Sequence, residues 1–272
     1  MISLGSHPVW HPVFESLGYA AGYAVFRRMR ARRGDVIGEP QRWTVIAAAA
    51  VGALLGSRLL GLAEQWPTVL SALRQGHWLA LLFSPGGKTI VGGLLGGWAG
   101  VEIVKRISGI RSRTGDLFAV PLCVGIAVGR IGCFLAGLAD DTYGKPTQLP
   151  WAVDFGDHVP RHPVQLYEII FLVTLAFVLS RPGRWPEGAR FRVFMGAYLA
   201  WRVAIDFLKP QPLVEGMNLI QWACVLGLCA IAVERIASHQ PGPARSAQSS
   251  RSHPITTRTG RTARLPPIAG LA

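Results

Sequence analysis

Three arginines, Arg58, Arg130 and Arg202, lie inside strongly apolar stretches of the chain. A guanidinium at the centre of a bilayer costs about 2.5–3.5 kcal/mol even on the insertion scale that gives the smallest values. Arginine stays charged at ordinary pH, and its planar fork of donors fits phosphate oxygens. The pattern therefore favours a site for an anion such as a lipid headgroup. For any single arginine, the alternative is an ion pair with a carboxylate inside the membrane or a head group that reaches the interface.

The residues next to two of these arginines bear on both interpretations. Gly129 and Gly132 stand on either side of Arg130, so the guanidinium is unshielded, as a phosphate clamp would require. Asp206 follows Arg202 at the i, i+4 spacing of neighbours on a helix surface. An ion pair that makes this helix insertable explains Arg202 and Asp206 at least as well as a direct catalytic role.

A further motif runs from Arg161 to Glu168, Arg-His-Pro-Val-Gln-Leu-Tyr-Glu. Its proline predicts a helix start, which places His162 at the interface and Gln165 and Glu168 on neighbouring helical positions. A histidine in this company is a candidate general base. A hydrogen bond at the helix end is the more common role of such a histidine.

Glycines and cysteines have simpler explanations. The run that contains Gly92 and Gly93 continues to Gly100, and glycines four residues apart favour close helix packing; the alternative is a surface for a lipid headgroup or acyl chain. The four cysteines lie in apolar runs without C-x-x-C or Cys/His spacing, so they indicate neither a zinc site nor a disulfide framework. We expect packing roles for most of them.

The composition places the chain among polytopic membrane proteins. Half of the 272 residues are hydrophobic, only 16% are charged, and the mean hydropathy is +0.32; soluble domains carry about 25% charged residues. The net charge of +13 lies in short clusters between apolar runs. This pattern is typical of membrane topology signals and argues against nucleic-acid binding.

We predict an all-α fold of seven transmembrane helices, each near the ~20 residues that cross a bilayer. The predicted spans are 12–27, 43–62, 89–104, 116–138, 163–180, 193–208 and 218–236. Together they form one membrane domain, residues 1–237, with an outward interfacial arm at 63–88 and a polar outward loop at 139–162. Residues 238–272 predict a disordered basic cytoplasmic tail.

The distribution of lysine and arginine predicts the orientation. With the N-terminus outside, the cytoplasmic segments 27–42, 105–115, 181–192 and the tail from 235 hold 20 of the 28 Lys and Arg residues. The outward segments hold Arg74, Lys88, Lys145, Arg161 and Lys209. This asymmetry predicts a cytoplasmic C-terminus.

The motifs together resemble the prolipoprotein diacylglyceryl transferase family. The resemblance covers roughly residues 15–235. Its elements occur in the family's order: Gly-Ser-Arg-Leu at 56–59, the glycine run from 92, Gly-Arg-Ile-Gly-Cys-Phe at 129–134, His-Pro-Val-Gln-Leu-Tyr-Glu at 162–168, and Arg202 with Asp206.

The resemblance implies a seven-span transferase of the bacterial inner membrane with its site on the outer face. Such an enzyme moves the diacylglyceryl group of phosphatidylglycerol to the lipobox cysteine thiol in the signal peptide of a prolipoprotein. It implies no cofactor or metal, and we expect a monomer. The implied catalytic residues are Arg130, Arg202, His162 and Glu168. The implied substrate-binding residues are Arg58, Gly92, Gly93, Gly129, Gly132, Gln165, Tyr167 and Asp206.

The chain departs from the family pattern where protons are handled. Val91 stands where the family has a histidine, and Cys133, Phe134, Ala136 and Leu138 follow Arg130 where the family has Gly-Asn-Phe-x-Asn-x-Glu. We hypothesise that His162 and the pair Asp140-Asp141 substitute. Three alternatives stay open: a divergent paralogue that binds or modifies lipid with another acceptor, a lipid-binding membrane protein without catalysis, and an anion channel or transporter. The last expects inverted repeats, and the sequence has no convincing one.

Overall fold

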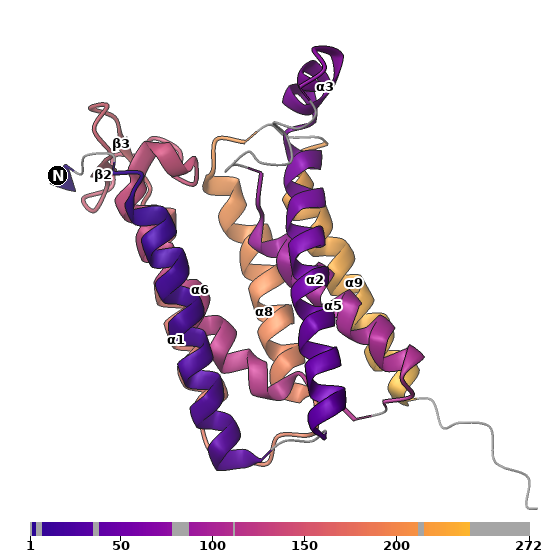
Figure 1. The fold of residues 1–272 in the computed structure, drawn as a ribbon. Helices are drawn as coiled ribbons and strands as arrows, with labels where there is room; N and C mark the ends of the chain where they lie inside the picture. Colours follow the sequence, from indigo (N-terminus) through magenta and orange to yellow (C-terminus); the bar gives the residue numbers. More distant parts are fainter. Residues whose placement is uncertain are drawn as a thin grey trace, which may run out of the picture.

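The computed structural model describes residues 2–3, 7–34, 38–77, 87–110, 112–211 and 215–239. In these residues the chain is mostly helical (Figure 1). Nearly all of the predicted tail from 238 lies outside the described residues, as does the 78–86 part of the predicted arm.

Each of the seven predicted spans falls on a helix. These helices are α1 (Trp10–Arg33), α2 (Glu39–Glu64), α5 (Ile90–Ile107), α6 (Asp116–Ala136), α7 (Val164–Ser180), α8 (Ala189–Ile205) and α9 (Leu219–His239). Three stretches are long and apolar enough to cross a membrane: Gln41–Glu64, Asp116–Asp140 and Leu219–Ile236. Val164–Ser180 is a shorter apolar helix. The fold is thus that of a helical membrane protein, while seven crossings and the orientation stay predictions.

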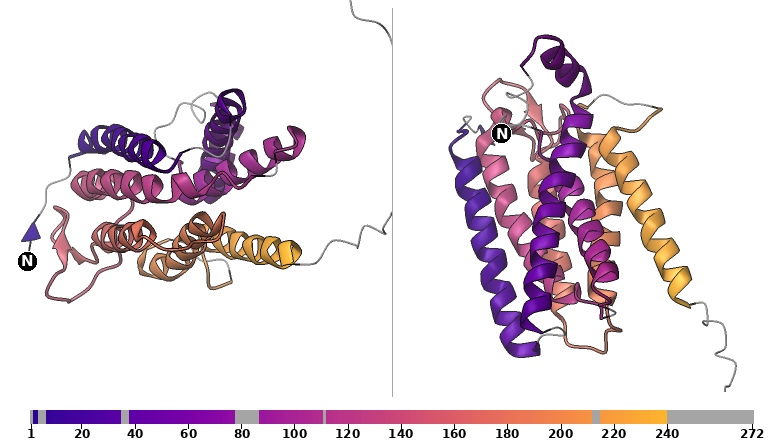
Figure 2. Two further views of the ribbon diagram at one scale, coloured as in Figure 1. Left: turned by 90° about the horizontal axis from the view of Figure 1, so that it is seen from below. Right: turned by 45° about the vertical axis from the view of Figure 1, so that its right-hand side comes forward.

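The helices of the bundle pack in pairs, and glycines let the backbones of two of these pairs come close together. Helix α2 packs along α5, α1 along α6, and α7 against α6 (Figure 2). A methyl group at Gly56 would lie 2.3 Å from the carbonyl oxygen of Gly92, and one at Gly96 would lie equally close to that of Gly52. Glycine is therefore required along this seam, which supports the packing explanation of the glycine run.

Helices α1 and α6 meet in the same way. A methyl group at Gly18 would lie 2.6 Å from the carbonyl oxygen of Gly125. At the upper end of the pair in Figure 1, a methyl group at Gly132 would lie 2.9 Å from the carbonyl oxygen of Trp10. The start of α1 is thereby held directly beside the end of α6.

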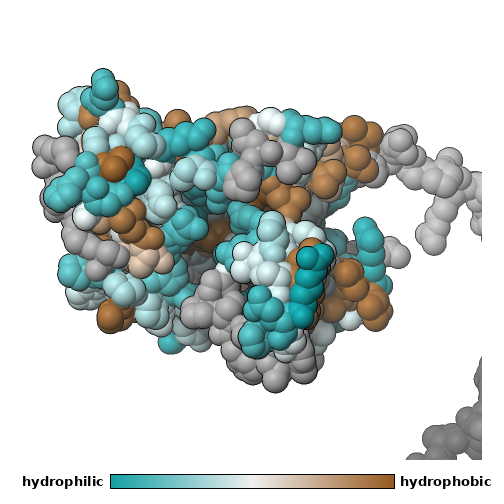
Figure 3. Space-filling view, turned by 90° about the horizontal axis from the view of Figure 1, so that it is seen from above, coloured by the Kyte–Doolittle hydropathy of each residue, from teal (hydrophilic) through white to brown (hydrophobic). Residues whose placement is uncertain are grey.

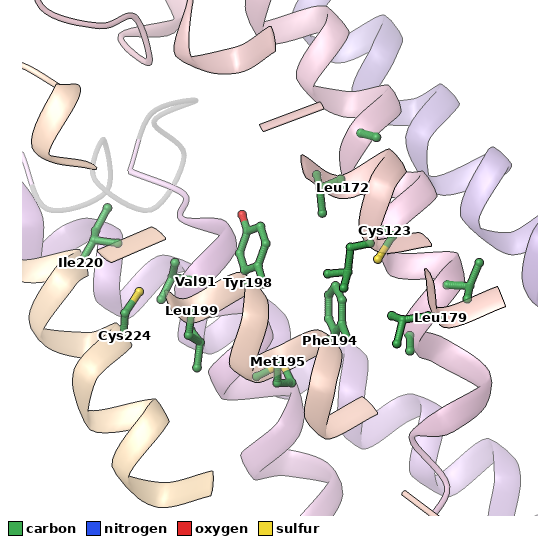
Figure 4. Packing of buried hydrophobic residues seen from close by; sticks show 14 residues of the cluster. Val91, Cys123, Leu172, Leu179, Phe194, Met195, Tyr198, Leu199, Ile220 and Cys224 are labelled. Atoms are coloured by element: carbon green, nitrogen blue, oxygen red, sulfur yellow. The ribbon is translucent and has the colours of Figure 1, made fainter. Parts of the chain in front are cut away.

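The apolar core lies between α5, α6, α7, α8 and α9. Val91, where the motif resemblance implies a histidine, is fully buried in this cluster with Tyr198 and Leu199 (Figure 4). The phenol of Tyr198 is the polar exception among these side chains, and its hydroxyl donates a hydrogen bond to Glu168. The core therefore borders directly on charged groups.

Short elements gather at one end of the bundle, which also carries α3 (Trp66–Arg74) (Figure 1). The 3₁₀ turn η1 (Gly137–Asp140) follows α6, and a small sheet pairs β2 (Val153–Asp154) in parallel with β1 (Ile2–Ser3) and antiparallel with β3 (Pro160–Arg161). Periodicity did not predict these two-residue strands. The Asp154 carboxylate accepts hydrogen bonds from three backbone amides of the following turn, at 2.8–3.1 Å, so this part of the loop 139–162, which is predicted to face outward, is ordered.

The opposite end carries the basic connections. Arg113 forms a 2.7 Å ion pair with Glu234 near the end of α9, and its backbone amide donates to Glu187. Asp116 accepts hydrogen bonds from the amides of Gly188 and Phe191 at the start of α8. The predicted cytoplasmic segments 105–115 and 181–192 therefore lie at one end, together with the end of α9.

Candidate active site

Arg130 and Arg202 meet on the carboxylate of Glu168. Nε of Arg130 lies 2.9 Å from Oε2 of Glu168, and Nη1 of Arg202 lies 3.7 Å from the same oxygen. All three side chains are at most 6% exposed. The structure thus joins two of the three predicted arginines through a third predicted residue, on α6, α8 and α7.

The other ends of these groups are also engaged. The second Glu168 oxygen accepts a 2.7 Å hydrogen bond from the hydroxyl of Tyr198, and Nη2 of Arg202 donates to Asp206 at 2.9 Å. Asp206 lies in the 3₁₀ turn η2 (Asp206–Leu208), directly after α8. The predicted i, i+4 pair of Arg202 and Asp206 is therefore present, which agrees with the ion-pair interpretation. We call Arg130, Glu168, Arg202, Asp206 and Lys209 the anion cluster.

Lys209 belongs to this cluster, although the sequence predicts for it only a place among the outward loop charges. Its Nζ lies 3.0 Å from Oδ1 of Asp206, and the side chain is 5% exposed. Burial and, to a smaller extent, the nearby Arg202 lower the pKa of Lys209 to about 8, while Asp206 opposes the shift. No sequence motif marks Lys209; only its i+3 spacing from Asp206 was a usable signal.

The cluster keeps donors for a ligand. Among the described residues, neither Nε of Arg130 nor Nε of Arg202 has a hydrogen-bond acceptor in good geometry. The Arg130 Nε lies 2.9 Å from a Glu168 oxygen, but its N–H is not directed at that oxygen. Oδ1 of Asp206 is likewise in ion-pair contact without a well-directed hydrogen bond. Buried N–H groups without acceptors destabilise the fold, and such groups often mark a functional site. Within the ion pairs of the anion cluster, three cations face two carboxylates. An anion with several oxygen acceptors would satisfy both the donors and the charge.

A second group of polar side chains lies beside the first. His11 at the start of α1 contacts Asp140 through Nδ1, and the same nitrogen lies 4.0 Å from Sγ of Cys133. Arg130 connects the two groups, because its Nη1 donates to Cys133 Sγ at 3.7 Å. The hydrogen bond with Asp140 raises the pKa of His11 to about 10. We call His11, Cys133 and Asp140 the histidine–cysteine cluster.

Sequence reasoning missed two members of this cluster. His11 stands in no motif, and Cys133 was assigned a packing role; Asp140 was singled out only as one of a possible acidic pair. Asp140 also accepts a hydrogen bond from Thr142, whose hydroxyl accepts from Nε2 of the predicted Gln165 at 3.3 Å. This chain of hydrogen bonds connects the start of α1 to α7.

The remaining predicted residues are spread around these clusters. His162 lies 3.4 Å from the hydroxyl of Tyr167, which accepts from Trp151 at 2.7 Å, so the predicted base is paired within the loop region. Arg58 is half-buried on α2, and its membership of the site stays a prediction. The glycine positions differ: Gly92 and Gly93 face α2, Gly132 packs on α1, and Gly129 has open space within 4 Å of where a Cβ would lie.

The end of the molecule that carries α3 and the small sheet is hollowed near its centre. Figure 3, seen from this end, shows the depression with hydrophilic residues around it. Two cavities are located elsewhere, lined by residues such as Phe26, Arg42, Arg113 and Asp116 at the opposite end. Neither contains a predicted site residue.

Known proteins match nearly the whole bundle. The family model for prolipoprotein diacylglyceryl transferase matches residues 1–236. The chain belongs to the prolipoprotein diacylglyceryl transferase family. A phosphatidylglycerol–prolipoprotein diacylglyceryl transferase of Geobacter sulfurreducens is 32% identical over 74% of this chain and 77% of its own length. Those of Methylococcus capsulatus and Dehalococcoides mccartyi are each 31% identical, over 78% and 85% of this chain and 82% and 88% of their own lengths.

Membership in the prolipoprotein diacylglyceryl transferase family makes this chain part of a transferase family of membrane proteins that serves lipoprotein biosynthesis. The resemblance inferred from the motifs is thereby confirmed. Val91, where the motif resemblance implies a histidine, is fully buried in the apolar core.

Proposed function

We propose that the protein transfers the diacylglyceryl group of phosphatidylglycerol to the lipobox cysteine thiol in the signal peptide of a prolipoprotein. The observation that carries the proposal is the pair of buried arginines on Glu168, whose two Nε atoms lack acceptors among the described residues. Relatives named for this reaction match 74% and 78% of the chain.

The anion cluster provides the binding and the electrostatic part of the reaction. The acceptor thiol gives up its proton to water, and its sulfur attacks the glyceryl carbon to form the new C–S bond. The C–O bond to phosphate breaks with its electron pair moving to the phosphate oxygen, and glycerol phosphate leaves. The phosphate therefore gains negative charge as the reaction proceeds. Guanidinium donors already fixed in a buried network stabilise that charge without having to reorganise, and Lys209 adds a third cation.

The carboxylates of the cluster have a positioning role. Two arginines and a lysine this close together would repel one another in a medium of low dielectric constant. Glu168 and Asp206 each contact two of the cations, which holds the guanidinium planes in place. The open space at Gly129, beside Arg130, fits a lipid headgroup that approaches the backbone closely.

We place this site at the outer face of the bacterial inner membrane, in a seven-span protein with its N-terminus outside. The support is the segregation of Lys and Arg, together with the gathering of α3 and the loop 139–162 at the end that bears both clusters. Phosphatidylglycerol and an exported signal peptide both reach that face.

Complementation tests the proposal. The gene is expressed in a bacterium depleted of its own transferase, next to Arg130→Ala and to Arg161→Ala as the matched control, because Arg161 pairs with the exposed Asp157 outside the cluster. Growth and thioether-linked diacylglyceryl on a reporter prolipoprotein are expected with the wild type and Arg161→Ala, and absent with Arg130→Ala. Absence of the modification with well-expressed wild-type protein would reject the proposal.

A lipid-binding function without catalysis is the second candidate, and Val91 favours it. A buried valine cannot accept a proton, so the base that the family resemblance implies at this position is absent. Under this alternative, wild-type protein binds phosphatidylglycerol in an Arg130-dependent manner but forms no thioether.

A further inference from the structure

Three ligand-type side chains from separate backbone segments converge where α1 meets the end of α6. His11 belongs to the first turn of α1, Cys133 to the last turn of α6, and Asp140 to η1. The candidate ligand atoms, an imidazole nitrogen, the sulfur and a carboxylate oxygen, all lie within 4.8 Å of one another. Cys133 is buried, the Asp140 side chain is 4% exposed, and the His11 side chain is 43% exposed.

We propose that His11, Cys133 and Asp140 form a binding site for Zn²⁺ with three protein ligands and one open position. Nitrogen, thiolate and carboxylate are the ligands that zinc takes in proteins, and three of them with a free fourth position is the arrangement of catalytic zinc. A tetrahedral zinc with ordinary bond lengths places its sulfur and nitrogen ligands roughly 3.6 Å apart. Sγ of Cys133 and Nδ1 of His11 are 4.0 Å apart, so this pair needs only a small adjustment. The direct contact between Nδ1 of His11 and the Asp140 carboxylate would have to open to admit the ion.

The charge of the cluster is compatible with a dication. A Cys133 thiolate and the Asp140 carboxylate would together balance the two positive charges of zinc. The occupied site beside Arg130 would therefore carry no net charge. Asp140 is also oriented from behind, because its other oxygen accepts a hydrogen bond from Thr142; a hydrogen bond of this kind to a ligand carboxylate is a common feature of metal sites.

The location of the metal site suggests a role in activating the acceptor thiol, and this role rests on the proposed function. A thiol that binds zinc is deprotonated, so an acceptor cysteine at the open position would lose its proton to water and bind as the thiolate. That sulfur would then stand next to Arg130, which contacts both Cys133 and Glu168. Zinc would thereby do the work of the base that Val91 cannot do.

Metal analysis tests the site without reference to activity. The full-length protein in detergent is stripped with chelator, incubated with ZnSO₄, dialysed and analysed for metal. The variants are Cys133→Ala and His11→Ala, and the matched control is Cys229→Ala, because Cys229 is an exposed free cysteine on α9. We expect about one zinc per chain in the wild type and the control, and at least tenfold less in the two variants.

Two further measurements guard against a variant that simply misfolds. Zinc should raise the melting temperature of the wild type and of Cys229→Ala, and Co²⁺ in its place should give a thiolate-to-cobalt charge-transfer band in both. Asp140→Asn, which keeps the shape of the side chain, should bind zinc at least tenfold more weakly. A wild type that binds no zinc, or Cys133→Ala that binds as the wild type does, overturns the inference.

The two proposals fail separately. Zinc bound at this cluster without thioether formation in the depleted strain rejects the transferase proposal and leaves the metal site standing. Thioether formation by a chain that binds no zinc does the reverse.

Discussion

The anion cluster and the histidine–cysteine cluster lie side by side and are built on different principles. In the anion cluster every member is charged and buried, and each carboxylate serves two cations. In the histidine–cysteine cluster one member is half-exposed and one is a thiol. The anion cluster holds charged side chains in place inside a medium of low dielectric constant. The histidine–cysteine cluster keeps groups that can lose protons within reach of solvent. Their only described direct connection is the contact between Arg130 and Cys133.

The largest expected difference between the clusters is in stability. Glu168→Gln leaves two buried guanidinium groups without their shared counterion, and breaking a buried ion pair from one side costs about 3–5 kcal/mol. Asp140→Asn removes one charged partner from the half-exposed His11 and should cost at most about 1.5 kcal/mol. Denaturant unfolding of the two variants in detergent measures both values. Equal losses would show that the clusters do not differ in this respect.

The next expected effect is on turnover. Arg202→Ala should lower the rate of diacylglyceryl transfer by about 10²–10³-fold, the usual loss when one donor to a developing negative charge is removed. Arg202→Lys restores charge without the planar fork and should recover part of the rate. The assay follows thioether formation on a lipobox peptide at saturating lipid. An unchanged rate in Arg202→Ala would restrict Arg202 to a structural ion pair with Asp206.

The pH dependence of lipid binding tests Lys209. Because its pKa is lowered to about 8, Lys209 is a cation below pH 8 and loses its charge above it, while Arg130 and Arg202 stay charged. The charged groups around it are Asp206, Glu168, the two arginines and Glu64 at the end of α2.

The expected result is a KM for phosphatidylglycerol that rises above pH 8, by up to about tenfold per pH unit if the charge is essential. Lys209→Arg should keep KM flat over the same range, since arginine does not deprotonate. A turnover rate that instead rises through pH 8 in the wild type and not in Lys209→Arg would assign Lys209 to proton transfer, and would remove it from the anion cluster's function.

The smallest effect is expected at Gly129. A methyl group there meets nothing within 4 Å, whereas one at Gly96 would lie 2.3 Å from a backbone oxygen of α2. Gly129→Ala should leave the melting temperature unchanged and raise KM for the lipid a few-fold, and Gly96→Ala should lower the melting temperature. A Gly129→Ala enzyme with unaltered KM would show that the lipid does not use this space.

The sequence predicted the helices well because apolar runs carry a strong signal. All seven predicted spans coincide with helices, although α1 runs to Arg33, beyond the predicted end at residue 27. Basic residues in its last turn interact favourably with the helix dipole. The helix therefore continues through polar residues beyond the point where the apolar run ends. The strands were missed because two residues carry no periodicity.

The site residues that lie a few positions apart along the chain were predictable from the sequence. Arg202 with Asp206 follows from i, i+4 spacing, and Glu168 from its motif. His11 was not predictable, since its partner Cys133 is 122 residues away along the chain. Lys209 was missed for a similar reason: its burial depends on the fold around η2, where the Lys145 amide donates to the carbonyl of Leu208, and a count of charges along the chain cannot see this.

The glycine contacts between α1 and α6 determine how accurately these two helices are aligned, and the histidine–cysteine cluster is divided between them. His11 is on α1, Cys133 is on α6, and Asp140 is in η1, which follows α6. A slide of one helical turn, about 5.4 Å, would separate them completely, and a methyl group at Gly18 would already push the helices apart. The accuracy with which the imidazole meets the thiol and the carboxylate is therefore maintained by residues two turns further along the helix, which carry no chemistry of their own.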